Sequence, residues 1–236
     1  MPESLVVTLA IYRRAFARGA VLAVKNWPVL LSIFAYAALL SVGVYTAMFL
    51  RLAGGLVLSL IVSACCGSFL YLVEMIVRTN KVSWEDFTRS FGVYLWDVVG
   101  VNFALWLLSL ATGALIAQLP QGLFVVAAIR LVLFVFFNAV PELIYLGHYS
   151  LMGLLSSSYE FIANNWIEWF PPNLLLLGGL FLIWQAPIGD GFLPMLARSA
   201  LLALFLYFAM VVRGLLFIEL DGSTRRARIF RYKMGN

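Results

Sequence analysis

Residues 52–77 read LAGGLVLSLIVSACCGSFLYLVEMIV, and this stretch decides the fold class of the chain. It contains one charged residue, Glu74, and lies between Arg51 and the charged segment 78–81. A run of about 20 apolar residues is long enough to cross the hydrocarbon core of a bilayer as a helix. We therefore predict that residues 52–77 form a membrane-spanning helix.

The composition of the whole chain agrees with this prediction. Of its 236 residues, 64% are hydrophobic and only 11% are charged. A soluble domain has roughly 25% charged and 45–50% apolar residues, so a soluble enzyme, a disordered chain, collagen and a coiled coil are excluded. The predicted fold class is an all-α polytopic membrane protein.

Six stretches are long and apolar enough to span a bilayer. They are residues 28–50, 52–77, 92–117, 122–147, 171–188 and 193–219. The connections at 51, 118–121 and 189–192 are too short to hold a domain, which predicts three helical hairpins. We expect residues 1–236 to form a single integral membrane domain with no extramembrane domain.

The basic residues predict the orientation, because Lys and Arg accumulate on the cytoplasmic side. The segment before the first span, the loop after the second span and the basic tail 222–236 together hold most of the 16 Lys and Arg residues. We therefore predict that both termini are cytoplasmic and that the chain lies in a cell inner membrane. Segment 148–170 should lie on the same side, yet it contains no Lys or Arg.

An internal pattern recurs with a period near 70 residues. A tryptophan opens each hairpin and a glutamate stands near the end of its second arm: Trp27 and Glu74, Trp96 and Glu142, Trp166 and Glu219. The pattern predicts three repeats, 3–80, 81–147 and 148–221. The alternative is that interfacial tryptophans and charges at helix ends recur in any six-span protein.

Each predicted repeat begins with an amphipathic segment that we expect to lie in the lipid headgroup layer: 3–25, 82–91 and 150–166. Such helices attract anionic lipids through their basic residues. The basic residues that we expect to face anionic headgroups are Arg13, Arg14, Arg18, Arg225, Arg226 and Arg228.

Two polar features are predicted for the second span. Ser59, Ser63 and Gly67 form a stripe of small residues, which is typical of close helix approach. Glu74 lies seven residues beyond Gly67 on nearly the same face, and Arg78 follows one turn later. We expect Glu74 and Arg78 to form an ion pair.

The second hairpin aligns polar residues when its tip is placed at Pro120. Asn102 then lies opposite Asn138, and these two asparagines can hydrogen-bond across the hairpin. Asp97 lies opposite Glu142, and two close carboxylates would share a proton or bind a cation. The alternative is that this acidic pair is close enough to the cytoplasmic surface to be hydrated.

Two further residues concern the same hairpin. Pro141 lacks a backbone donor, so we expect the carbonyl of Phe137 to have no partner. Arg130 lies about 12 Å from the start of the fourth span by helix rise, where a charge is costly and requires a partner. The predicted polar sites inside the bilayer are Arg130, Glu142, Asp97, Asn102, Asn138 and Glu74.

Catalytic signatures are missing from the sequence. His148 is the one histidine, which excludes sites with two histidines, and no phosphate-binding glycine loop occurs. Cys65 and Cys66 are adjacent and lack metal-ligand spacing, so we interpret them as packing residues. We predict no metal, no cofactor, no nucleic acid and no enzyme activity.

The interfacial segments, the Lys25-Asn26-Trp27 and Asn164-Asn165-Trp166 junctions and the paired spans resemble uncharacterised bacterial multipass inner-membrane families. One is the membrane domain attached to some glycerophosphoryl diester phosphodiesterases. The resemblance covers most of the chain and implies a bacterial inner membrane. The hydrolytic domain is absent, so it implies no catalytic residues.

Segments 3–25 and 82–91 are also similar to parts of the membrane subunit of an ABC-2-type exporter, which has an N-terminal elbow and a cytoplasmic helix. The threefold pattern does not fit that subunit. Three hypotheses follow: a non-catalytic subunit of a transport or assembly complex, a permease for a lipid or small solute, and an intramembrane enzyme. The expected partners are anionic lipid headgroups and a protein within the membrane or at its cytoplasmic face.

Overall fold

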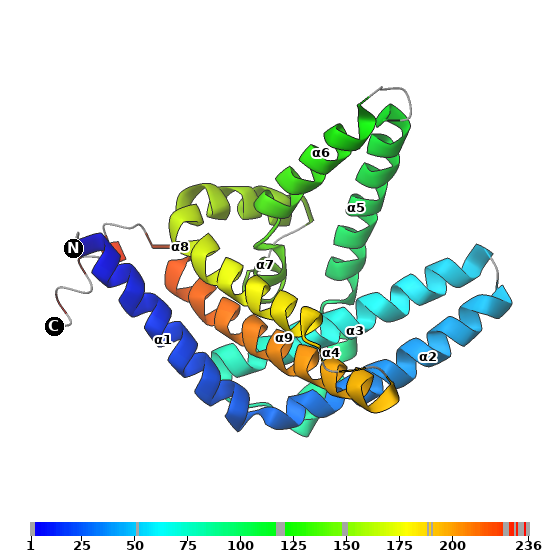
Figure 1. The fold of residues 1–236 in the computed structure, drawn as a ribbon, viewed down its shortest axis with the longest axis horizontal. Helices are drawn as coiled ribbons and strands as arrows, with labels where there is room; N and C mark the ends of the chain where they lie inside the picture. Colours follow the sequence, from blue (N-terminus) through cyan, green and yellow to red (C-terminus); the bar gives the residue numbers. More distant parts are fainter. Residues whose placement is uncertain are drawn as a thin grey trace. The chain divides into compact units, whose positions relative to one another are not determined.

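The structure, a computed structural model, describes residues 3–50, 52–116, 121–147, 151–187, 189, 191–223, 227, 228, 230 and 234. Within these ranges every regular element is a helix (Figure 1). The elements in chain order are α1 (Glu3–Lys25), the 3-10 helix η1 (Trp27–Leu31), α2 (Ser32–Leu50), α3 (Leu52–Thr79), α4 (Trp84–Val93), α5 (Leu95–Ile116), α6 (Gly122–Phe136), α7 (Val140–Leu146), α8 (Leu151–Gln185) and α9 (Phe192–Leu220).

Six helical stretches of the described chain are long and apolar enough to span a membrane, as the sequence predicts. They are Trp27–Leu50, Ala53–Thr79, Leu95–Gly113, Gly122–Leu146, Leu151–Gln185 and Phe192–Leu220. The fold class is therefore that of an all-α, multi-pass integral membrane protein.

The fifth span differs from its prediction. It begins at Leu151 rather than at residue 171, so residues 151–166 of the predicted segment 150–166 are part of α8 and not a separate helix; residue 150 lies outside the described residues. Pro171 and Pro172 lie inside this helix, although proline removes the bond to the carbonyl four residues earlier. The carbonyl that Pro172 leaves free is that of Glu168, and the Tyr12 hydroxyl donates to it at 2.8 Å. A donor from α1 thus replaces the missing amide.

The fold divides into two compact units. The first contains Met1–Ile33, Val73–Ser83 and Asn165–Asn236, and the second contains Phe34–Leu72 and Trp84–Asn164. Because α3 and α8 each begin in the second unit and end in the first, the division falls inside helices.

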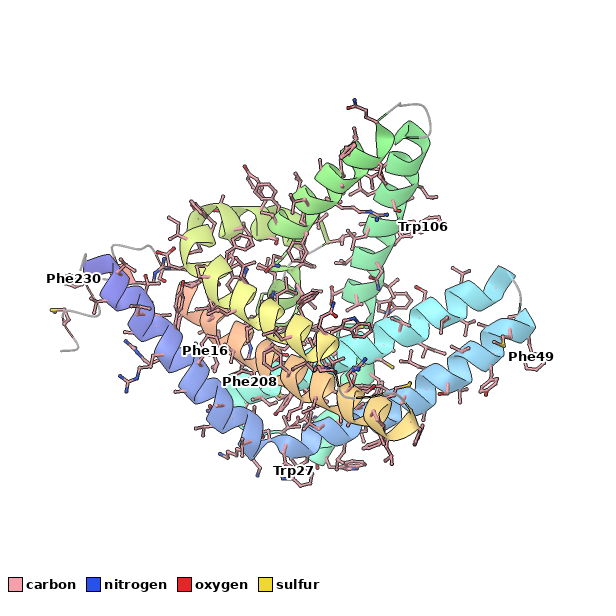
Figure 2. All side chains as sticks on the ribbon, viewed as in Figure 1. Phe16, Trp27, Phe49, Trp106, Phe208 and Phe230 are labelled. Atoms are coloured by element: carbon pink, nitrogen blue, oxygen red, sulfur yellow. The ribbon has the colours of Figure 1, made fainter. Side chains whose placement is uncertain are left out.

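In the first unit, α1 lies along α9 (Figure 1). The buried face of α1 repeats every four residues through Val7, Ile11 and Ala15, as expected for one side of a helix. Gly19 continues this face, and a Cβ atom placed on it would lie 2.6 Å from Cγ2 of Val212. Phe16 and Phe208, labelled in Figure 2, pack with ring centroids 6.2 Å apart.

The remaining core of the first unit is centred on Trp169 of α8, which is fully buried. Its ring meets Phe217 of α9 edge-on, with centroids 6.3 Å apart. The guanidinium of Arg213 lies 5.1 Å from the centroid of the same indole, a distance at which a cation is attracted to the ring face. Apolar packing and one cation–π contact therefore join α8 to α9.

In the second unit, α2 and α3 approach closely, since a Cβ atom on Gly54 would collide with the backbone of Ala47. Side-chain hydroxyl groups join this helix pair to α4. Ser68 hydrogen-bonds both to Tyr36 of α2, at 2.9 Å, and to Ser90 of α4. Ser68 and Ser90 are fully buried, so these bonds satisfy polar groups inside an apolar core.

Candidate intramembrane site

The second arm of the second hairpin is interrupted between α6 and α7, within the second unit. Helix α6 ends at Phe136 and α7 begins at Val140. The amide of Val140 donates to the carbonyl of Phe137 at 3.2 Å, so the prediction that this carbonyl has no partner is wrong. The hydroxyl of Ser158 on α8 donates to the carbonyl of Phe136 at 2.7 Å. The carbonyls of Phe136 and Phe137, five and four residues before Pro141, therefore both have donors, one from α8 and one within the turn.

A pocket of about 420 Å³ lies where α6 leaves α5. The side chains that line it are all apolar and come from four helices and from Phe137, which follows α6. They include Val101, Ala104 and Leu108 of α5, Leu133 of α6, Pro141 of α7 and Leu155 of α8. The proline that ends the straight course of α6 is therefore also a wall of the pocket.

The structure does not bring the two predicted carboxylates together. Glu142 is fully buried in α7, where it has an interaction partner. Asp97 is half-buried in the first turn of α5 and has no partner among the other described side chains. A turn at 137–139 interrupts the straight hairpin on which the predicted pairing depends.

The asparagine pair is also different from its prediction. Asn102 donates to the hydroxyl of Ser63 on α3, at 3.2 Å, rather than to Asn138; Asn138 has another interaction. Ser63 is fully buried, and a Cβ atom on Gly67 would lie 3.1 Å from the carbonyl carbon of Tyr94. Ser63 and Gly67 therefore face the start of α5, as a stripe of this kind indicates, whereas Ser59 is exposed.

Arg130 lies on α6 with an exposed side chain. Within the described part of the chain it has neither a hydrogen-bond nor an ion-pair partner. Leu131 and Val132 beside it are exposed large apolar residues. Arg130 is thus a cation on the apolar surface of a spanning helix.

The predicted ion pair of α3 is confirmed. Nε of Arg78 lies 3.0 Å from a carboxylate oxygen of Glu74. Glu74 is buried whereas Arg78 is exposed, so the arginine places its charge outside the packed end of α3.

The predicted lipid-facing basic residues divide into three groups. Arg13, Arg14 and Arg18 of α1 are exposed, and Arg18 donates to the Oδ1 atom of Asn80 at 3.0 Å. Arg225 and Arg226 lie outside the described residues. Arg228 contradicts the prediction, because it is buried and only 6% exposed.

Arg228 binds protein groups instead of lipid. One guanidinium nitrogen donates to the carbonyls of Leu220, at 3.1 Å, and Ser223, at 2.6 Å. It also donates to Oδ1 of Asn165 at 3.2 Å, and the other nitrogen lies 3.8 Å from the Glu168 carboxylate. Arg228 therefore caps the C-terminal end of α9 and joins it to α8.

Two asparagines that precede tryptophans have structural roles that the sequence interpretation missed. Asn26 is buried; it accepts from the amide of Val82 at 3.0 Å and donates to the carbonyl of Asn80 at 3.3 Å. Asn165 is also buried and accepts from Arg228. Val82 lies eight residues after Glu74, and Arg228 lies nine residues after Glu219. The Asn-Trp junctions were the available signal for these two residues.

No group of three or more His, Cys, Asp or Glu side chains placed to hold a metal ion occurs in the described residues. No protein-family model, curated protein or solved structure matches the sequence.

Proposed function

We propose that this chain is a non-catalytic membrane subunit of a larger transport or assembly complex in a bacterial inner membrane. The observation that carries the proposal is the position of Arg130 on the exposed apolar surface of α6. A second membrane protein with an acidic residue at matching depth is the partner that this arginine would bind.

The energetic argument starts from the cost of the charge. An arginine near the centre of a spanning helix costs at least about 2.5–3.5 kcal/mol, and such residues usually pair within a bundle or face water. No described residue of this chain supplies an anion to Arg130. A carboxylate from a neighbouring chain would neutralise the arginine and make charge-assisted hydrogen bonds with it.

The surroundings of Arg130 support a helix as the partner. Phe124, Leu131 and Phe134 of α6 have exposed apolar side chains. Another apolar helix can therefore pack closely against them. Helix packing in a bilayer depends on such contacts and on polar groups between helices.

Copurification in mild detergent followed by mass spectrometry tests this proposal. We expect a partner chain to remain with the wild-type protein, to be lost with Arg130→Glu and to remain with Arg13→Glu, a matched charge reversal on the exposed face of α1. Exchange of the partner's intramembrane acid for arginine should restore binding to Arg130→Glu. A wild-type protein that runs as a lone monomer on blue-native gels, or solute flux by the lone chain in vesicles, would contradict the proposal; flux would favour the permease hypothesis.

A further inference from the structure

We infer that the pocket between α5, α6, α7 and α8 binds one hydrocarbon chain of a membrane lipid. The pocket measures about 420 Å³, and every side chain that lines it is apolar. A pocket with this lining offers an anion, a sugar or a metal ion no hydrogen-bond or charge partner from a side chain, so only an apolar ligand matches its chemistry.

The pocket lies among membrane-spanning helices, where lipid acyl chains are the available ligand. Val101, Leu108 and Leu133 belong to helical stretches that are long and apolar enough to span a membrane. Around helices that span a bilayer, the surrounding solvent is lipid hydrocarbon rather than water. An apolar pocket left empty would lose the dispersion contacts of its walls, whereas an acyl chain entering from the bilayer would restore them.

The size of the pocket separates an acyl chain from a helix of a partner protein. A spanning helix is about 10 Å wide and about 30 Å long, which is several times larger than this pocket. A partner helix therefore does not fit inside it. A flexible hydrocarbon chain is narrower and can follow the gap between α5 and α6.

The cause of the pocket lies in the sequence. Proline lacks an amide hydrogen and its ring collides with the carbonyl four residues earlier, so it interrupts a helix. Here α6 ends at Phe136, and Pro141 stands in the first turn of α7 as one wall of the pocket. The two arms already diverge from the hairpin tip (Figure 1), and Ala104, a small residue, lines the gap between them, with α7 beyond the interruption as a further wall. The bound chain would fill the volume that the two arms do not.

Photo-crosslinking with a defined lipid tests the inference. The purified protein is placed in vesicles of phosphatidylglycerol that contain a small fraction of the same lipid with a diazirine near the middle of one acyl chain. We expect adducts concentrated in peptides that contain residues 101–108 and 133–141. After transfer to detergent, native mass spectrometry should show one retained lipid per chain.

Two filling variants and one control make the test specific. Ala104→Trp on α5 and Leu155→Trp on α8 should each lower both the pocket adducts and the retained lipid at least fivefold. Ala128→Trp places the same ring on α6 about 140° around the helix from Leu133, away from the pocket, and should change neither. Circular dichroism of each variant verifies that its helices are intact.

Three results would overturn the inference: adducts spread evenly over the exposed apolar surfaces of α2 and α6, no retained lipid in the wild-type protein, or unchanged labelling in both filling variants. The inference does not involve Arg130. The two proposals therefore fail separately: a partner chain that stays with Arg130→Glu contradicts the proposed function, whereas absence of retained lipid in the wild-type protein contradicts the lipid inference.

Discussion

The hydroxyl of Tyr12 in α1 donates a hydrogen bond, at 2.8 Å, to the backbone carbonyl of Glu168 in α8. This carbonyl is the one whose helical donor would be the amide of residue 172, which is a proline. The hydrogen bond thus both stabilises the proline-containing turn of α8 and joins α8 to α1.

This relationship predicts a specific non-additivity. Tyr12→Phe removes the donor and should destabilise the protein by about 1 kcal/mol. Pro172→Ala supplies an amide that can bond the same carbonyl, so Tyr12→Phe should cost clearly less in that background. Thermal unfolding of the four proteins in detergent measures the coupling. Equal costs in the two backgrounds would show that the hydroxyl does not replace the missing amide.

The same tyrosine predicts a dependence of stability on pH. Burial, together with the nearby Glu168 carboxylate, raises the pKa of Tyr12 from 10.0 to about 12. The folded state holds the Tyr12 proton more tightly than the unfolded state does. The contribution of Tyr12 to the free energy of unfolding is therefore complete below pH 10 and is lost as the pH rises towards 12. Tyr12 is only half-buried, so we expect an effect of about 1 kcal/mol. The difference in melting temperature between wild type and Tyr12→Phe should shrink over this range, and a constant difference would refute the prediction.

The sequence predicts the spanning helices well because a bilayer requires long apolar runs, and these are local features. It predicts the pair Glu74 and Arg78 for the same reason, since both residues lie one turn apart on α3. Asn102 could not be assigned correctly, because its partner Ser63 comes from another helix. Antiparallel numbering within one hairpin cannot find such a partner.

The remaining differences have equally specific causes. Pro171 and Pro172 predict a break in the helix because proline cannot donate to the carbonyl four residues earlier. The sequence does not show that Tyr12, on another helix, donates to one of these carbonyls. Arg228 belongs to a run of basic residues that favours an exposed tail. Its burial depends on acceptors at Leu220, Ser223 and Asn165, which only the folded chain brings together.

We expect Arg228→Ala to destabilise the first unit by about 2–3 kcal/mol, because it removes the cation 3.8 Å from the Glu168 carboxylate and the donor that caps the end of α9. Arg228→Lys should recover only part of this loss, since an ammonium group cannot reproduce the planar fork. Arg13→Ala is the control, because Arg13 is exposed and its loss should change stability by less than about 0.5 kcal/mol. Equal melting temperatures for Arg228→Ala and Arg13→Ala would contradict the buried position of Arg228.

Gly19 sets the distance between α1 and α9. A methyl group at this position would lie 2.6 Å from Cγ2 of Val212, whose branched side chain is stiff in a helix. Gly19→Ala should therefore destabilise the protein by about 1–3 kcal/mol, and by less when Val212 is also changed to Ala. Gly178→Ala on α8, where a Cβ atom meets nothing within 4 Å, should have no such cost. If both glycine variants melted together, the close approach would not hold.

The two Asn-Trp junctions give the last prediction, because their buried asparagines differ in what they satisfy. Asn26→Leu leaves the Val82 amide and the Asn80 carbonyl without this partner, and should cost about 1–3 kcal/mol. Asn165→Leu removes one of several acceptors of Arg228, so its cost should be smaller, about 1 kcal/mol. Asn164→Leu changes an exposed neighbour and should be nearly neutral. Thermal unfolding should rank the three variants in this order, and a neutral Asn26→Leu would show that the junction does not hold the segment after α3.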